Sequence, residues 1–191
     1  HLSYHSIKPL ETFFKKNGMD LFKVKRINTH GGSIRVYVQL TNGPHPKDDS
    51  VEQIKKIEDE KGLYRSETFF AYGNHIDKLK NKLLNLLTEI KLDGKKIAGY
   101  GAPAKATTLM YQFGLGLDFI DYIVDDNPLK QGLYTPGLHV PVKTKEYFFE
   151  NKPDYLLILA WNFAKPIIEN NEIFSKSGGK FIIPLPDIQI I

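Results

Sequence analysis

The strongest constraint on the fold of this chain is an alternation of short apolar runs with helical segments that begins near residue 95. The runs that predict strands are 96–100, 119–125, 155–160 and 180–185. The segments that predict helices are about 103–113, 144–150 and 163–176. Near-continuous apolar strands that alternate with helices are typical of a parallel sheet covered on both faces. We therefore predict an α/β fold, a Rossmann-like parallel sheet with helices on both faces.

The region before residue 95 is organised differently. Helical spacing of apolar residues predicts a helix over 6–17, and the alternating segments DLFKVKRI and SIRVYVQL predict a strand hairpin. A helix and a hairpin are too small to fold alone, so they indicate the end of an upstream domain. The Pro-, Gly- and Asp-rich segment 41–49 marks a boundary. We predict two parts, residues 1–41 and residues 42–191.

A helical connector is predicted between the boundary and the sheet, with helices over about 50–61 and 66–91. The second helix carries an apolar stripe, Leu79, Leu83, Leu86, Leu87 and Ile90. Such a stripe usually packs against a core. An exposed edge of it could instead pair with a copy of itself, so an oligomer or a docking role remains an alternative.

The turn between the first predicted strand of the sheet and its helix has the composition of a phosphate-binding loop. Residues 99–104, Gly-Tyr-Gly-Ala-Pro-Ala, fit the G-x-G-x-x-G/A pattern. Gly99, Gly101 and Ala102 let the backbone approach a pyrophosphate, and the first amides of the following helix point at it. Lys105 adds a positive charge beside those amides. The turn is predicted to bind nucleotide phosphates; the alternative is a tight corner without a ligand.

An acidic pair follows the second predicted strand. Asp125 and Asp126 end the segment FIDYIVDD, a little over twenty residues after the glycines. In dinucleotide-binding folds a carboxylate about 20 residues after the loop accepts ribose hydroxyl groups. This spacing favours a nucleotide ligand but does not distinguish a dinucleotide from a nucleotide-sugar.

Two connections lie where a parallel sheet places its ligands, beyond the carboxyl ends of the strands. Residues 126–142 are rich in turn formers, and residues 160–167 offer Trp161 and Asn162 just before a helix. Both side chains are predicted to contact the ligand. The alternatives are interdomain packing for Trp161 and a helix N-cap for Asn162.

The net charge of +4 and the isoelectric point near 9.0 favour an acidic small-molecule ligand over nucleic acid. The lysines are interleaved with acidic residues, and no nucleic-acid recognition motif accompanies them. No apolar run reaches the roughly 18–20 residues of a membrane span, so no membrane partner is predicted. The chain has no cysteine, which fits a cytoplasmic protein.

Other catalytic classes find no support in the sequence. The six histidines show no metal-ligand spacing, so no metal site is predicted, and a G-x-S-x-G nucleophile motif is absent. The start, HLSYHSIKPL, resembles neither a signal nor a transit peptide. It also lacks an initiator Met, which suggests a fragment of a longer protein.

With these segments the chain resembles the C-terminal part of the S-adenosylmethionine-dependent sugar C-methyltransferases, which methylate a ketosugar carbon of nucleotide-linked deoxysugars. The stretches that carry the resemblance are HLSYHSIKPL, THGGSIRVY, GYGAPAKATTLM, VDDNPLKQGLYTPGLHVPV and LAWNFAKPIIE. They follow the family order over nearly the whole chain.

The resemblance implies three successive parts: a cysteine-rich zinc domain, a methyl-donor-binding domain, and a C-terminal domain that holds the nucleotide-sugar. Residues 1–41 would end the second part, and residues 42–191 would be the third. His1 falls on the histidine that acts as base at the α-carbon of the ketosugar. S-adenosylmethionine and zinc would bind upstream. No cofactor is therefore expected in these 191 residues, which would bind a dTDP-ketosugar without methylating it.

A different enzyme class remains open. An NAD(P)-dependent oxidoreductase, or a nicotinamide-sensing domain, would use the same glycine turn and Asp125. The residues that follow offer no second domain with a hydride-transfer acid or base.

Overall fold

The computed structural model describes residues 3–191 and divides them into two compact units, one reaching to residue 75 and the other from residue 76 onward. The predicted catalytic residue His1 lies outside the described residues. None of the described helices is both long and apolar enough to cross a membrane.

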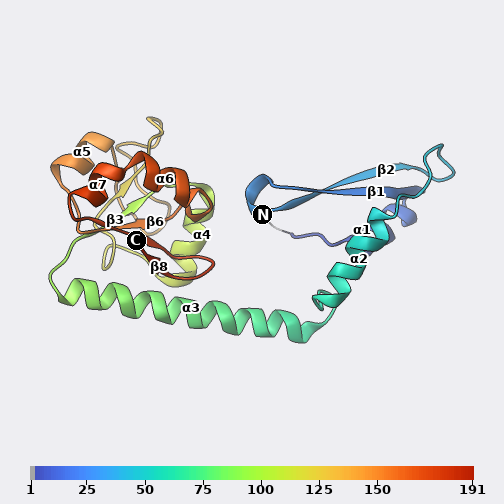
Figure 1. Cartoon of the computed structure of the whole chain (residues 1–191), viewed down its shortest axis with the longest axis horizontal. Coiled ribbons are helices and arrows are strands. Elements are labelled where there is room, and N and C mark those ends of the chain that lie inside the picture. The colour runs from blue at the N-terminus through green and yellow to red at the C-terminus, as the bar shows by residue number, and fades with distance from the viewer. Residues whose placement is uncertain (1–2) are drawn as a thin grey trace. The chain divides into compact units, whose positions relative to one another are not determined.

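The first unit contains two helices and a hairpin (Figure 1). Helix α1 (Ile7–Lys16) precedes the antiparallel strands β1 (Met19–Ile27) and β2 (Ser33–Leu40), which a short 3-10 helix (Thr29–Gly31) connects. Helix α2 (Ser50–Glu60) follows. These bounds confirm the helix and the hairpin predicted from the apolar periodicity.

A small core holds the first unit together, formed by Ile7, Leu21, Val24 and Val51. Glu58 on α2 is only 7% exposed, and both of its carboxylate oxygens accept the amide of Ile7 at 3.0 Å. The hydroxyl of Tyr64 donates to the same carboxylate. Burial, together with that carboxylate, raises the pKa of Tyr64 to about 12. Helix α2 is thus fixed to the start of α1, across the 41–49 segment.

Helix α3 (Ser66–Leu92) is a single helix of 27 residues (Figure 1). Its predicted apolar stripe is buried within the second unit at Leu79, Leu83, Leu87 and Ile90, and Leu86 is partly buried there. The stripe packs against the sheet of its own chain, as the commoner use of such a pattern predicts. It is therefore not a free surface for pairing with another copy.

The second unit is built on a six-stranded sheet of mixed α/β type. In chain order its strands are β3 (Ile97–Tyr100), β4 (Ile123–Val124), β5 (Val142–Lys143), β6 (Tyr155–Ile158), β7 (Lys180–Ile183) and β8 (Gln189–Ile190). Their order in space is β5-β4-β3-β6-β7-β8, and every pair is parallel except β7 with β8. The predicted parallel sheet is therefore correct, with an antiparallel strand at one edge.

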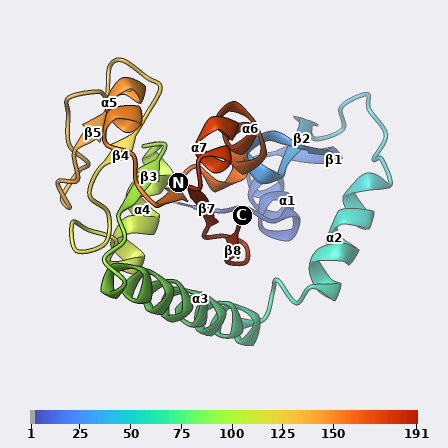
Figure 2. The same ribbon diagram turned by 60° about the vertical axis from the view of Figure 1, so that its left-hand side comes forward.

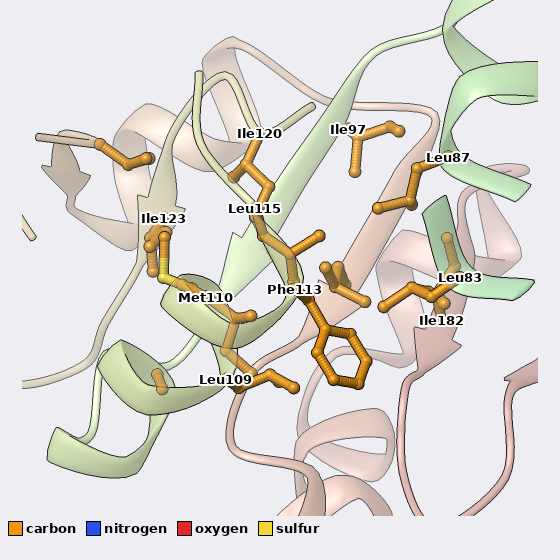
Figure 3. Close-up of a cluster of buried hydrophobic side chains, with 14 of the residues drawn as sticks. Leu83, Leu87, Ile97, Leu109, Met110, Phe113, Leu115, Ile120, Ile123 and Ile182 are labelled. Atoms are coloured by element: carbon orange, nitrogen blue, oxygen red, sulfur yellow. The ribbon is translucent and has the colours of Figure 1, made fainter. Parts of the chain in front are cut away.

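Two clusters of buried side chains show that helices cover both faces of this sheet. Consecutive strand residues alternate between them: Ile97 belongs to the first cluster and Ala98 to the second. The first cluster includes residues of α3 and α4 (Ala104–Phe113), and Figure 3 shows their side chains meeting those of the strands.

The second cluster lies against the opposite face. It includes Phe148 of α5 (Lys145–Glu150) and Phe174 of α7 (Glu172–Lys176). Helix α6 (Ala164–Asn170) contributes partly buried side chains. Figure 2 shows α5, α6 and α7 on the side of the sheet away from α3.

The helix predicted over 163–176 is wrong in one respect, because it is two helices, α6 and α7. The break falls at Asn171, which is 2% exposed and has φ −125°. Its side-chain amide donates to the carbonyl of Ile167 at 2.7 Å. A side chain that bonds the preceding turn competes with the backbone ladder of the helix.

Candidate functional site

The predicted site residues gather where the direction of the sheet topology reverses. The chain runs from β3 outward through β4 to β5, and then returns to β6 on the other side of β3. In open parallel sheets the loops beyond the carboxyl ends of the strands diverge at such a point and leave room for a ligand. The loops after β3, β4 and β6 carry the predicted binding residues except Gly99, which lies within β3, and Lys105, which lies in the first turn of α4.

The two glycines have a packing reason of their own. A Cβ atom on Gly101, whose φ is +84°, would lie 2.8 Å from the Cβ of Ala160. A Cβ on Gly99 would lie 2.9 Å from side-chain atoms of both Ile123 and Leu159. The loops after β3 and β6 therefore approach more closely than any larger residue permits, whether or not a ligand binds.

Asp125 closes the β3–α4 turn from inside. The amide of Ala102 donates to its Oδ2 at 2.7 Å, and the Lys130 ammonium lies 3.2 Å from the same oxygen. The amide of Asn127 donates to Oδ1 at 2.9 Å. This carboxylate is 7% exposed, and both of its oxygens are bonded to protein donors. Its main role is therefore to fix the shape of the turn. A ribose hydroxyl would share the carboxylate with these donors.

Asp126 is exposed and accepts the hydroxyl of Tyr100, at 2.9 Å to Oδ2 and 3.1 Å to Oδ1. Burial raises the pKa of Tyr100 to about 12, and the Asp126 carboxylate adds to this effect because it disfavours a second negative charge. Tyr100 thus remains a neutral hydrogen-bond donor at physiological pH. Its hydroxyl fixes the orientation of the Asp126 carboxylate.

Two amides at the start of α4 are left for a ligand. The first amides of a helix have no partner within it. Gly101 donates to Val124 and Ala102 donates to Asp125, whereas among residues 3–191 the amides of Ala104 and Lys105 meet no acceptor. Free amides at the positive end of a helix favour an anion.

Lys105 lies beside these amides and is held by the loop after β6. Its ammonium lies 4.7 Å from the ring centroid of Trp161 and 5.6 Å from that of Phe163, and it donates to the side-chain oxygen of Asn162. Burial lowers the pKa of Lys105. Within the described part of the chain no carboxylate forms an ion pair with it. The site therefore holds a positive charge that no acidic side chain neutralises.

The two alternatives for the loop after β6 have different outcomes. Asn162 is not a helix N-cap, because it lies inside the 3-10 turn Trp161–Phe163 and bonds Lys105. Trp161 packs against the first core cluster, which belongs to its own unit, so this contact does not test the interdomain packing suggested for the residue. The same ring faces the Lys105 ammonium, so packing and ligand contact are compatible.

Sequence reasoning missed four polar or aromatic residues that shape this site: Tyr100, Asn127, Lys130 and Phe163. Lys130 had a local signal, because it follows Asp125 by five residues in a turn-rich connection. The partners of Tyr100 and Phe163 are Asp126 and Lys105, which lie far from them in the sequence, so no local signal could reveal them. Among the side chains that the structure describes, which do not include those of His1 and His30, no cluster of acidic or histidine residues could hold a metal ion.

Together the fold and the site describe an α/β domain with a glycine-containing turn and two unpaired helix amides at the carboxyl edge of its parallel strands. The sequence model of the C-methyltransferase C-terminal domain matches residues 28–186, so the chain belongs to that family. Over all 191 residues it is 34% identical to the C-methyltransferase NovU of Streptomyces niveus. It spans 46% of that relative, about half its length. The resemblance noted from the sequence is thus confirmed at the level of the C-methyltransferase family.

Proposed function

We propose that the second unit is the nucleotide-sugar-binding domain of an S-adenosylmethionine-dependent C-methyltransferase that acts on a nucleotide-linked ketodeoxysugar. The observation that carries this proposal is the unneutralised Lys105 ammonium beside two free amides of α4. This arrangement suits a diphosphate, which is the charged part of a nucleotide-sugar. Family membership supplies the methyl transfer.

The strand order supports a Rossmann-like assignment. The order β5-β4-β3-β6-β7-β8 corresponds to 3-2-1-4-5-6, the order of the doubly wound dinucleotide-binding fold. The antiparallel pairing of β8 departs from that fold only at the edge, far from the switch point. We also propose that residues 42–191 form the C-terminal domain, with the second unit as its ligand-binding part, and that residues 1–41 complete the methyl-donor-binding domain.

The chemistry of the parent enzyme follows from the ketone. A carbonyl acidifies the neighbouring C–H bond, and His1 would remove that proton because a neutral imidazole is a suitable base near pH 7. S-adenosylmethionine, bound upstream, supplies the methyl group when present, and any zinc belongs to the first domain. We further propose that these 191 residues bind the substrate without methylating it, and that the parent is cytoplasmic.

The single tryptophan, Trp161, allows a direct test because it faces Lys105. Titration with dTDP should change its fluorescence. Lys105→Ala should weaken dTDP binding about 10- to 100-fold, which corresponds to roughly 1–3 kcal/mol for a lost charge-assisted hydrogen bond. Lys165→Ala, at a lysine whose side chain is 86% exposed, is the matched control and should bind as the wild type does.

Thermal stability separates binding from folding. A cation in the first turn of a helix is mildly unfavourable, so Lys105→Ala should melt at the wild-type temperature or slightly above. An unchanged dissociation constant for dTDP in Lys105→Ala would show that Lys105 does not contact the ligand. Absence of dTDP binding by the wild-type chain would contradict the proposed function itself.

A nicotinamide-dinucleotide site is the second candidate, since the strand order and the position of Asp125 fit that class equally well. NADH titrated into the same chain decides between them. Tight NADH binding without a response to a dTDP-sugar would replace the first proposal with the second.

A further inference from the structure

A pocket of about 220 Å³, the slot, opens beside the candidate site, between α4 and the connection that follows β4. Its helix side is formed by Ala106, Thr107 and Met110, and its opposite side by Leu133, Tyr134 and Pro136. The exposed lining surface is mainly apolar, and Lys130 is its one charged residue.

The far wall of the slot is fixed in place. The amide of Gly132 donates to the carbonyl of Val142 at 2.9 Å, and the amide of Val142 donates to the carbonyl of Leu133 at 2.8 Å. Gly137 lies so close to the Tyr111 ring of α4 that a Cβ there would overlap the phenol hydroxyl. The wall is thus tied both to the sheet and to the helix.

The slot and the anion-accepting amides share one loop. Residues 102–104 line the slot, and the free amides of Ala104 and Lys105 lie at the same turn. A group bound in the slot is therefore directly beside a group bound at the amides. A nucleoside diphosphate has this construction, because a single pentose joins its flat ring to its diphosphate and lets the two occupy neighbouring positions.

The size and polarity of the slot favour a nucleobase over a sugar ring. Its volume is below the roughly 300–1,000 Å³ of complete small-molecule sites, so it holds one part of a ligand. A hexose would lose its hydrogen bonds to water among apolar walls. A nucleobase presents two apolar faces, and stacking on an aromatic side chain such as Tyr134 favours it.

We propose that the slot binds the pyrimidine base of the nucleotide-sugar, which rests on the proposed function of the second unit. The diphosphate then lies at the amides of Ala104 and Lys105. Lys105 connects this position to Trp161 and Asn162 on the far side, which places the sugar near the loop after β6.

The two methionines of the chain give a direct readout. Met110 lines the slot, whereas Met19 lines a larger hollow of about 650 Å³ in the first unit. With carbon-13 labels on the methionine methyl groups, dTDP should shift the Met110 signal and leave Met19 unchanged. Inorganic pyrophosphate should bind and leave both signals in place. A shift of Met19 alone with dTDP would put the base elsewhere and overturn the proposal.

Thr107→Phe fills the slot, and Thr108→Phe on the next, exposed position of the same helix is its matched control. Thr107→Phe should raise the dissociation constant of dTDP at least tenfold and leave that of pyrophosphate unchanged. Thr108→Phe should change neither. Should Thr107→Phe not fold, Tyr134→Ala removes the stacking wall at a side chain that is 64% exposed.

Leu129→Ala, in the same connection but 84% exposed and outside the slot, is the control for Tyr134→Ala. Tyr134→Ala should also weaken dTDP binding severalfold, and Leu129→Ala should not. If the wild type binds dTDP and the slot variants bind it equally well, the slot proposal is wrong and the proposed function stands. If the wild type binds neither dTDP nor pyrophosphate, both are wrong.

Discussion

Gly101→Ala should destabilise the second unit far more than the same change at another glycine with a similar backbone conformation. Gly101 has φ +84°, and its added Cβ would lie 2.8 Å from the Cβ of Ala160. The left-handed conformation costs a residue with a Cβ about 1–2 kcal/mol, and forcing an extra carbon into a packed site costs about 1–3 kcal/mol. Together they predict a loss of about 2–5 kcal/mol.

Gly114 at the end of α4 provides the control. Its φ is +72°, and its Cβ would meet nothing within 4 Å. Gly114→Ala should therefore carry only the conformational cost of about 1–2 kcal/mol. The measurement is urea unfolding followed by Trp161 fluorescence, which reports on the second unit.

A second substitution separates the steric cost of Gly101→Ala from its conformational cost. Ala160→Gly removes the atom that the new Cβ would strike, so the double variant with Gly101→Ala should recover the steric part of the loss. Equal losses for Gly101→Ala and Gly114→Ala, or a double variant without recovery, would refute the close approach of the loops after β3 and β6.

Three further predictions concern stability. Glu58→Ala should cost about 1–3 kcal/mol, because it leaves the buried amide and hydroxyl that its carboxylate accepts without a partner; urea unfolding monitored by circular dichroism measures it. Leu83→Ala, at a fully buried position, should cost about 2–5 kcal/mol, whereas Leu92→Ala, 82% exposed, should stay within about 0.5 kcal/mol in the same assay. Bonding to the Lys96 amide lowers the pKa of Asp154 from 3.8, so its stabilising contribution is complete above that pH and disappears as the pH falls through the lowered value. The stability difference between wild type and Asp154→Asn should accordingly shrink in unfolding curves taken from pH 6 down to pH 3, and a constant difference would contradict this linkage.

The elements with a repeating apolar pattern were predictable from the sequence. Helix α3 places Leu83 and Leu87 one turn apart, and β6 is apolar on both faces, so each pattern reflects burial along a single element. The edge strands β5 and β8 are two residues long and exist through pairing with a neighbour. Such short segments carry no periodicity, which is why they were not predicted.

The candidate site was predictable in its position but not in its internal bonds. The glycine turn and Asp125 followed from spacing, because strand ends of a parallel sheet meet at one edge. The bond from Ala102 to Asp125 joins residues 23 positions apart, and Lys105 meets Asn162 across 57 positions. These contacts depend on the register between strands, which no local pattern encodes.

The bond between Asp125 and the Ala102 amide has a kinetic consequence. A turn that its own chain already holds in shape does not have to become ordered when a ligand arrives. Association is then a single encounter step whose rate rises in proportion to ligand concentration, without a slow rearrangement.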